Sequence, residues 1–257
     1  MHSKSFGIFS SLLLSKSLDG ASDAHVVAQE FATLLHNHHI RDILLPINML
    51  RCTVYTYQLG VKAALKVITL STMKLRKTKH VICTRQANRP IFKKYSKNMH
   101  EQGEQEPPCL DCVTRWNSTL VMYQQAIKLR DVMICTISDI AITHDFTDHT
   151  LTNEDWNHIQ SIEQWLLVPA VICNYLSGSK YPTLSVAGLA FNHLLTHCNR
   201  YQAMNVDSIE SPIEKMTLQV QQLASERCLQ YLIKYQESLK STPSRIAMFL
   251  DPRYMNF

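Results

Sequence analysis

The feature that most constrains the fold is a long helical repeat of apolar residues with few residues able to interrupt it. Between positions 151 and 178 the repeat has spacings of three, four and seven, at Trp156, Ile159, Ile162, Leu166 and Cys173. That spacing is typical of an amphipathic helix. The 257 residues include only 6 glycines and 9 prolines, too few for many short strands and tight turns. We therefore predict a mainly α fold.

The ends of this helix can also be predicted. Thr152 is suited to the N-cap position, and Asp155 three residues later completes the pattern of a capping box. Gly178 is placed to end the helix, and Pro169 is predicted to kink it because proline removes one backbone hydrogen bond. Trp156 and Trp165 lie on the apolar side and are expected in the core. Further helices are expected over about 183–198 and 212–240.

Basic residues are concentrated in the segment 43–100. It holds 12 of the 26 Lys and Arg residues and no Asp or Glu, so all 21 acidic residues lie elsewhere. The basic residues are Arg51, Lys62, Lys66, Lys74, Arg76, Lys77, Lys79, Arg85, Arg89, Lys93, Lys94 and Lys97. Such a charge division favours a nucleic acid or an anionic membrane surface as partner. Interleaved aromatics, such as Tyr57 and Phe92, could stack on unpaired bases.

A purely structural explanation of the basic segment stays open. Its basic residues could line the solvent side of a helix over 65–82, with apolar residues packed inward on the other side. The residues expected to pack inward are Leu65, Ile68, Leu70, Met73 and Val81. In that case the charges would have no ligand.

The sequence "TRWNST" opens another amphipathic pattern, with Leu120, Tyr123 and Ile127 at spacings of three and four. Arg115 and Trp116 stand directly at the start of this helix. A tryptophan in that place is either an anchor in the core or a side chain that contacts a ligand. The residues alone leave both alternatives open.

The first half of the chain contains a weaker α/β pattern. Residues 6–35 are expected to form a strand, a turn and a helix, which places Asp19 at a strand end where side chains often carry chemistry. A strand leading into a helix is expected over 52–66. The polar, proline-containing stretch 99–108 is predicted to be a linker.

The eight cysteines stand mostly among apolar residues, which indicates free thiols in a reducing compartment rather than disulfides. Cys109 and Cys112 have the spacing of half a zinc site, but no matching second pair is present. His36, His38 and His39 form a polar cluster that is expected to be exposed rather than to bind metal. Residues 6–14 could form the apolar part of a signal peptide, although a buried strand is favoured, and no segment has the length of a membrane span.

Four stretches carry a resemblance to a known family. They are "LDGAS" (18–22), "RCTVYTYQLGVKAALK" (51–66), "LDCVTRWNSTLVMY" (110–123), and "LSGSKYPTLS" (176–185) taken with "IAMFLDPRYMNF" (246–257). In this order they resemble motifs of the catalytic region of hAT-superfamily DNA transposases and of the BED-zinc-finger proteins derived from them. The third and fourth are the more specific. Tyr55 departs from the pattern, which has a histidine there.

The resemblance implies an RNase H-like core interrupted by a helical insertion. Such a core cuts and rejoins DNA with two divalent ions, Mg²⁺ or Mn²⁺, held by an Asp-Asp-Glu triad. Asp19 matches the second Asp. The first Asp is expected upstream of this sequence and the Glu downstream of it, because Glu226 precedes "FLDPRY" and lies inside a predicted helix. We therefore expect a truncated, catalytically incomplete fragment that binds no metal productively.

By the same resemblance, Arg115 and Trp116 match a pair that approaches the DNA end, with the tryptophan stacking on a displaced base. The expected domains are a partial RNase H-like core with the basic segment (1–98), a linker (99–108) and the helical insertion (109–257). The expected fold is thus mainly α with a partial α/β element.

The expected function is nonspecific DNA binding at most, in the nucleus, by a transposase-derived protein without enzymatic activity. The expected DNA-binding residues are Arg51, Lys62, Lys66, Lys74, Arg76, Lys77, Lys79, Arg115 and Trp116. Self-association or binding to related transposase-derived proteins is the other expected contact, and no membrane partner is expected. The alternative is a helical protein-interaction module with no nucleic-acid role, and the alternative location is the cytoplasm. An active nuclease would need carboxylates from another chain.

Overall fold

A computed structural model of the chain describes residues 17–18, 50–51, 53–84, 87–99, 103, 105–112, 115–143, 150–177 and 184–239. Two short strands, β1 (Ser17–Leu18) and β2 (Leu50–Arg51), pair in parallel. The helices in the first half are α3 (Thr53–Leu65), the 3-10 helix η2 (Lys66–Ile68), α4 (Thr69–Thr84) and α5 (Asn88–Met99). Those in the second half are α6 (Trp116–Lys128), α7 (Arg130–Thr143), α8 (Asn153–Leu176), α9 (Leu184–Gln202), the 3-10 helix η4 (Val206–Ser208) and α10 (Pro212–Leu239).

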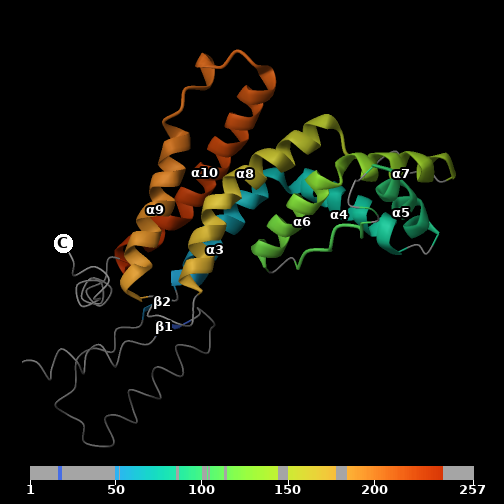
Figure 1. Ribbon diagram of the computed structural model, residues 1–257. Helices are drawn as coiled ribbons and strands as arrows, with labels where there is room; N and C mark the ends of the chain where they lie inside the picture. Colours follow the sequence, from blue (N-terminus) through green and yellow to red (C-terminus); the bar gives the residue numbers. More distant parts are fainter. Residues whose placement is uncertain are drawn as a thin grey trace, which may run out of the picture. The chain divides into compact units, whose positions relative to one another are not determined.

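The described part of the chain is mainly helical (Figure 1), which confirms the fold class predicted from the apolar spacing. Within the stretch 52–66, which was expected to lead from a strand into a helix, the described residues 53–66 are helical, and the two-residue strand β2 lies just before it. The partial α/β element therefore stays a prediction. The two late helices are present as α9 and α10. An RNase H-like core stays a prediction. Several predictions fall outside the described residues: the turn at Asp19, the histidines at 36–39, the helix end at Gly178 and the segment 246–257.

Helix α8 forms as its sequence predicts. The backbone N–H of Asp155 donates to Thr152 Oγ1 at 3.2 Å, and the N–H of Thr152 donates to Asp155 Oδ2 at 3.0 Å, so the capping box is reciprocal. The predicted apolar side is buried throughout, and so are Trp156 and Trp165. The helix continues through Pro169.

Helix α4 has a different buried side from the one predicted. The inward-facing residues recur every three or four positions and are Ser71, Thr72, Leu75, Thr78, Lys79 and Ile82. Leu70 and Met73, which were expected to pack inward, are 75% and 45% exposed. Of the other residues expected to pack inward, Ile68 is buried and Leu65 and Val81 are half-buried. The expectation was therefore partly wrong, because it considered apolar residues alone and the buried side also contains hydroxyls and a lysine.

Contacts divide the chain into two compact units. Unit 1 consists of residues 1–60, 171–199 and 227–257, and unit 2 consists of residues 61–170 and 200–226. Both units are therefore assembled from segments that are distant in sequence.

Unit 2 contains the packed group of α4, α5, α6 and α7 (Figure 1). Helix α5 packs on α7 and α4, and α7 also contacts α4 and α6. Tyr95 of α5 donates a 2.7 Å hydrogen bond to Asp139 of α7. Trp165 of α8 donates from Nε1 to Ser225 of α10 at 2.9 Å, so the two helices meet through a buried polar contact.

Unit 1 has an interior of apolar residues and thiols. Tyr57 of α3 is buried next to Cys173, Cys198 and Cys228, and burial, followed by these thiols, raises the pKa of its phenol. Gly60 lies so close to α10 that a Cβ would stand 3.1 Å from Cys228 Sγ. The helices approach closely here because this position has no side chain.

Three of the cysteines, at 173, 198 and 228, are buried free thiols as predicted, whereas Cys109 and Cys112 are exposed free thiols. Cys52 lies outside the described residues. Among the helices that the structure describes, none combines the length and the apolar character that a membrane span requires.

Candidate nucleic-acid interface

A cavity of about 230 Å³ lies where α3, η2, α4 and α6 meet in unit 2. It is lined by Lys62, Leu65, Lys66, Thr69, Thr72, Arg76, Trp116, Thr119 and Tyr123. Four of the residues predicted to bind DNA therefore gather around one hollow. We call it the α4–α6 cavity.

Trp116 is the first residue of α6, and it is only 2% exposed. Its indole N–H is buried and has no hydrogen-bond partner among the described residues. The preceding Arg115 is extended, and its carbonyl accepts hydrogen bonds from the N–H of Ser118 at 3.0 Å and from its hydroxyl at 2.6 Å. In this conformation Trp116 is a core anchor of α6 whose ring is closed to a stacking base.

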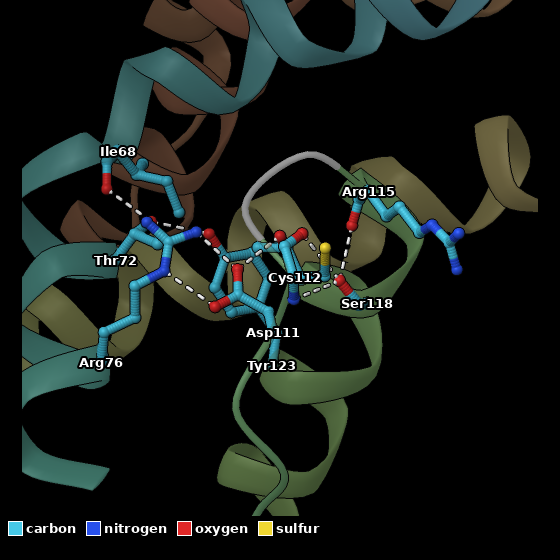
Figure 2. Close-up of polar contacts among 9 residues, drawn as sticks. Ile68, Thr72, Arg76, Asp111, Cys112, Arg115, Ser118 and Tyr123 are labelled. Atoms are coloured by element: carbon cyan, nitrogen blue, oxygen red, sulfur yellow. Dashed lines mark hydrogen bonds and ion pairs between the residues drawn. The ribbon is translucent and has the colours of Figure 1, made fainter. Parts of the chain in front are cut away.

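Arg115 behaves differently from its neighbour. Its side chain is exposed, and Figure 2 shows its guanidinium pointing away from the polar cluster around Asp111. The Ser118 hydroxyl that accepts from the N–H of Cys112 at 2.8 Å fixes the turn before the helix. The pair in "TRWNST" is thus divided, because the arginine faces solvent while the tryptophan is buried.

Arg76 is held by a carboxylate (Figure 2). Its Nε donates to Asp111 Oδ1 at 2.9 Å and its Nη2 donates to Asp111 Oδ2 at 2.5 Å, and Thr119 adds a 2.7 Å bond to Oδ2. The Asp111 side chain is 1% exposed. Burial alone raises its pKa, but the hydrogen bonds from Arg76 and Thr119 outweigh burial, and the pKa lies below its usual range. In a bidentate pair of this kind the guanidinium is engaged by the carboxylate, so the role of Arg76 is structural.

Thr72 and Tyr123 join α4 to α6 beside this pair. Their hydroxyl groups are 2.7 Å apart, and the Thr72 hydroxyl lies 2.9 Å from the carbonyl of Ile68, to which it donates. Burial raises the pKa of Tyr123 to about 12. The tyrosine is therefore neutral at every physiological pH and serves as a hydrogen-bonded wall of the cavity.

Lys74 is also paired. Its Nζ lies 2.7 Å from Asp155 Oδ2, and Ser71 donates to Asp155 Oδ1 at 2.8 Å. Burial raises the pKa of Asp155, but hydrogen bonds from Lys74 and from the capping box outweigh burial and lower it to about 2. The cap of α8 is thereby tied to α4.

Lys79 is the most unusual member of the basic segment. It is 0% exposed, and its Nζ has no hydrogen-bond partner among the described residues. Burial lowers the pKa of this lysine below its usual range, because a charged ammonium is disfavoured away from water. It cannot contact a DNA phosphate in this structure.

The remaining predicted cations are available to solvent. Lys66, Lys77 and Arg115 are exposed and Lys62 is half-buried, and none of the four forms an ion pair within the described part of the chain. Arg89, Lys94 and Lys97 on α5 are exposed as well. Arg51 lies in β2, and Asp19 is outside the described residues. The charge division along the sequence is therefore partly cancelled in space.

Two carboxylates that organise this region escaped the sequence analysis. Asp111 lies between Cys109 and Cys112, and only the two cysteines there were considered in the sequence analysis, as possible metal ligands. Asp155 was recognised as a capping residue but not as a partner of Lys74, 81 positions earlier. No group of three or more His, Cys, Asp or Glu residues suited to a metal ion occurs in the part of the chain that the structure describes.

Residues 50–165 match the family model for the ZBED1 RNase-like helical domain. The matched region runs from β2 through α7 into α8, so it contains the α4–α6 cavity and both carboxylate pairs. No curated protein and no solved structure matches the chain. The match supports a ZBED/hAT transposase-derived protein.

Proposed function

We propose that this chain is a transposase-derived protein that binds duplex DNA without sequence preference and has no strand-transfer activity. The single observation that carries the proposal is the set of four cations, Lys62, Lys66, Lys77 and Arg115, that form no ion pair within the described residues of unit 2. We place its action in the nucleus, where duplex DNA is available.

Binding through these cations would depend on charge. A lysine that neutralises a phosphate releases condensed counterions, and this release contributes about 0.9 to the slope of log affinity against log salt. The other basic residues of α4 have structural partners or are buried, so they contribute little. Binding would consequently be weak at physiological salt and insensitive to sequence.

The test compares duplex binding across a salt series for the parent and for Lys62→Gln, Lys66→Gln and Lys77→Gln combined. We expect the slope to fall by about 2 to 3, the loss of two or three phosphate contacts. The matched control is Lys79→Met, which removes a lysine from α4, the helix of Lys77, but from its buried side. An unchanged slope in the triple variant would refute DNA binding through this surface.

For these 257 residues, the proposed absence of strand transfer rests on the resemblance of their motifs to the transposase family. Of the triad that the family uses, one position, Asp19, is matched in this sequence, and one carboxylate cannot hold two metal ions. The test is incubation of supercoiled plasmid with Mg²⁺ or Mn²⁺. We expect no nicking above background, whereas nicking that disappears in Asp19→Ala would overturn the proposal.

One observation favours a second candidate, a helical protein-interaction module. The solvent side of α4 presents Leu70 and Met73, which are 75% and 45% exposed, between Lys66 and Lys77. Exposed apolar side chains on a helix are a common feature of helix docking. If the salt series shows no role for the lysines, this candidate becomes the leading one.

A further inference from the structure

The charged residues around the α4–α6 cavity all carry the same sign. They are Lys62, Lys66 and Arg76, and none of the described residues that line the cavity carries a carboxylate. Asp111, the nearest carboxylate partner, is bound to Arg76 and is not one of the lining residues. A ligand that enters this hollow therefore meets positive charge without an acidic competitor.

Most of the polar groups in the lining already have partners. The hydroxyl of Thr69 donates to the carbonyl of Lys66 at 2.8 Å, and that of Thr119 donates to Asp111. Thr72 and Tyr123 are bonded to each other. The lining donors that have no partner among the described residues are thus the ammonium groups of Lys62 and Lys66 and the indole N–H of Trp116. Each ammonium group can give several hydrogen bonds to an anion.

The size of the cavity limits the ligand. About 230 Å³ is somewhat below the roughly 300–1,000 Å³ typical of ligand pockets, so the cavity admits at most one nucleotide-sized group and excludes a duplex. Trp116 and Tyr123 are almost completely buried walls, so they offer no open ring face for stacking. Recognition would come from charge, with Leu65 supplying an apolar contact.

We propose that the α4–α6 cavity binds a phosphate group on a small organic body, of the size of one nucleotide. A phosphate suits two lysines because its oxygens accept several charge-assisted hydrogen bonds. The source is either a free mononucleotide or the 5′-phosphate at the end of a DNA strand. This inference goes beyond the proposed duplex binding and does not require it.

The experiment is calorimetric titration of the full chain at low salt with five probes: thymidine monophosphate, thymidine, inorganic phosphate, a short single strand with a 5′-phosphate, and the same strand without it. We expect saturable binding of thymidine monophosphate and none of thymidine. Tighter binding of the 5′-phosphorylated strand than of the free nucleotide identifies the DNA end as the source, and the reverse order identifies the free nucleotide.

Variants locate the site. Lys62→Gln and Lys66→Gln are each expected to weaken nucleotide binding by about tenfold, while Lys77→Gln, which does not line the cavity, should leave it unchanged. Three outcomes would overturn the inference. They are an equal loss of nucleotide affinity in all three variants, binding of thymidine as tight as that of thymidine monophosphate, and no binding of any phosphate probe. Inorganic phosphate binding as tightly as the nucleotide would do so too, because the organic body would then contribute nothing.

The result can be separated from the duplex-binding proposal. Duplex affinity is expected to depend on Lys77 as well as on the two cavity lysines, whereas nucleotide affinity depends on the cavity lysines alone. A chain that binds nucleotide but not duplex would keep this inference and refute the proposed function. A chain that binds duplex but not nucleotide would refute this inference and keep the proposed function.

Discussion

The interior of unit 1 and the buried side of α4 in unit 2 are built on different principles. In unit 1, Tyr57 is buried, and the thiol of Cys228 and the side chain of Leu232 pack against Gly60. On α4, the buried positions carry three hydroxyls and a lysine besides Leu75 and Ile82, and two carboxylates from distant segments bind its flanking cations. The first interior is held by apolar contact, whereas the second combines apolar contact with paired polar groups.

This difference decides how each region responds to change. Apolar packing loses stability in proportion to the volume that is added or removed. A buried polar pair fails more abruptly, because removal of one partner leaves the other without compensation in a place that water does not reach. We therefore expect the largest single effects in unit 2.

The most severe expected change is Asp111→Ala. It leaves the Arg76 guanidinium without its bidentate partner and the Thr119 hydroxyl without its acceptor. We expect unfolding free energy to fall by about 3–5 kcal/mol, as for one-sided removal of a buried ion pair. Urea unfolding followed by helical circular dichroism measures it.

The matched control is Glu106→Gln, which breaks the pair of Lys93 and Glu106. The Glu106 side chain is 68% exposed, and its carboxylate lies 3.0 Å from Lys93 Nζ. Exposed pairs of this type contribute about 0–1 kcal/mol. A loss as large as that of Asp111→Ala would mean that burial does not distinguish the two pairs.

The pH dependence of stability tests the second polar pair. The pKa of Asp155 is about 2 in the folded chain and about 3.9 in an unfolded one. A lowered pKa contributes stability above the unfolded value, and this contribution is lost as pH falls from about 4 towards 2. We expect a loss of about 2 kcal/mol across that window. Asp155→Asn should lack this part of the acid transition, and an identical acid profile in that variant would contradict the assignment.

The close approach in unit 1 is tested by Gly60→Val. A Cβ at this position would lie 3.1 Å from Cys228 Sγ and 3.3 Å from Leu232 Cδ2, so a branched side chain would overpack the interior. We expect a loss of about 1–3 kcal/mol in a thermal or urea unfolding experiment. Adding Cys228→Ala should recover part of the loss. A variant as stable as the parent would show that α3 and α10 are not tightly packed there.

The same difference explains what the sequence could reveal. Apolar spacing and the capping pattern predicted α8 from Thr152 to its buried tryptophans, because these signals lie within one segment. The partners of Lys74 and Arg76 are 81 and 35 positions away, and no local pattern connects them. For that reason the basic residues of the segment 43–100 were grouped together in the sequence analysis, whereas in the structure some of them are paired, one is buried and others are exposed.

The role of Trp116 shows a second limit of prediction from a local motif. The motif "TRWNST" indicated correctly that a helix starts there, and the residues left open whether the tryptophan is an anchor or a DNA contact. The burial that answers this question for the present structure depends on α3, η2 and α4, which precede the motif by up to about 50 residues. A local motif cannot report on such neighbours.

The smallest expected effect is also the sharpest test of the polar side of α4, and it concerns Lys79→Met. The lysine is buried without a hydrogen-bond partner among the described residues, and its pKa is lowered by burial. The unfolded chain therefore binds more protons than the folded chain near this pKa, so the parent should become more stable as pH rises towards 10.

Methionine fills similar space without a charge, so we expect the Lys79→Met variant to gain roughly 1 kcal/mol of unfolding free energy at pH 7 and to lose that part of the pH dependence. Duplex binding should be unchanged, because a buried ammonium contacts no phosphate. A destabilised variant with weaker DNA binding would show instead that Lys79 faces solvent and belongs with Lys77.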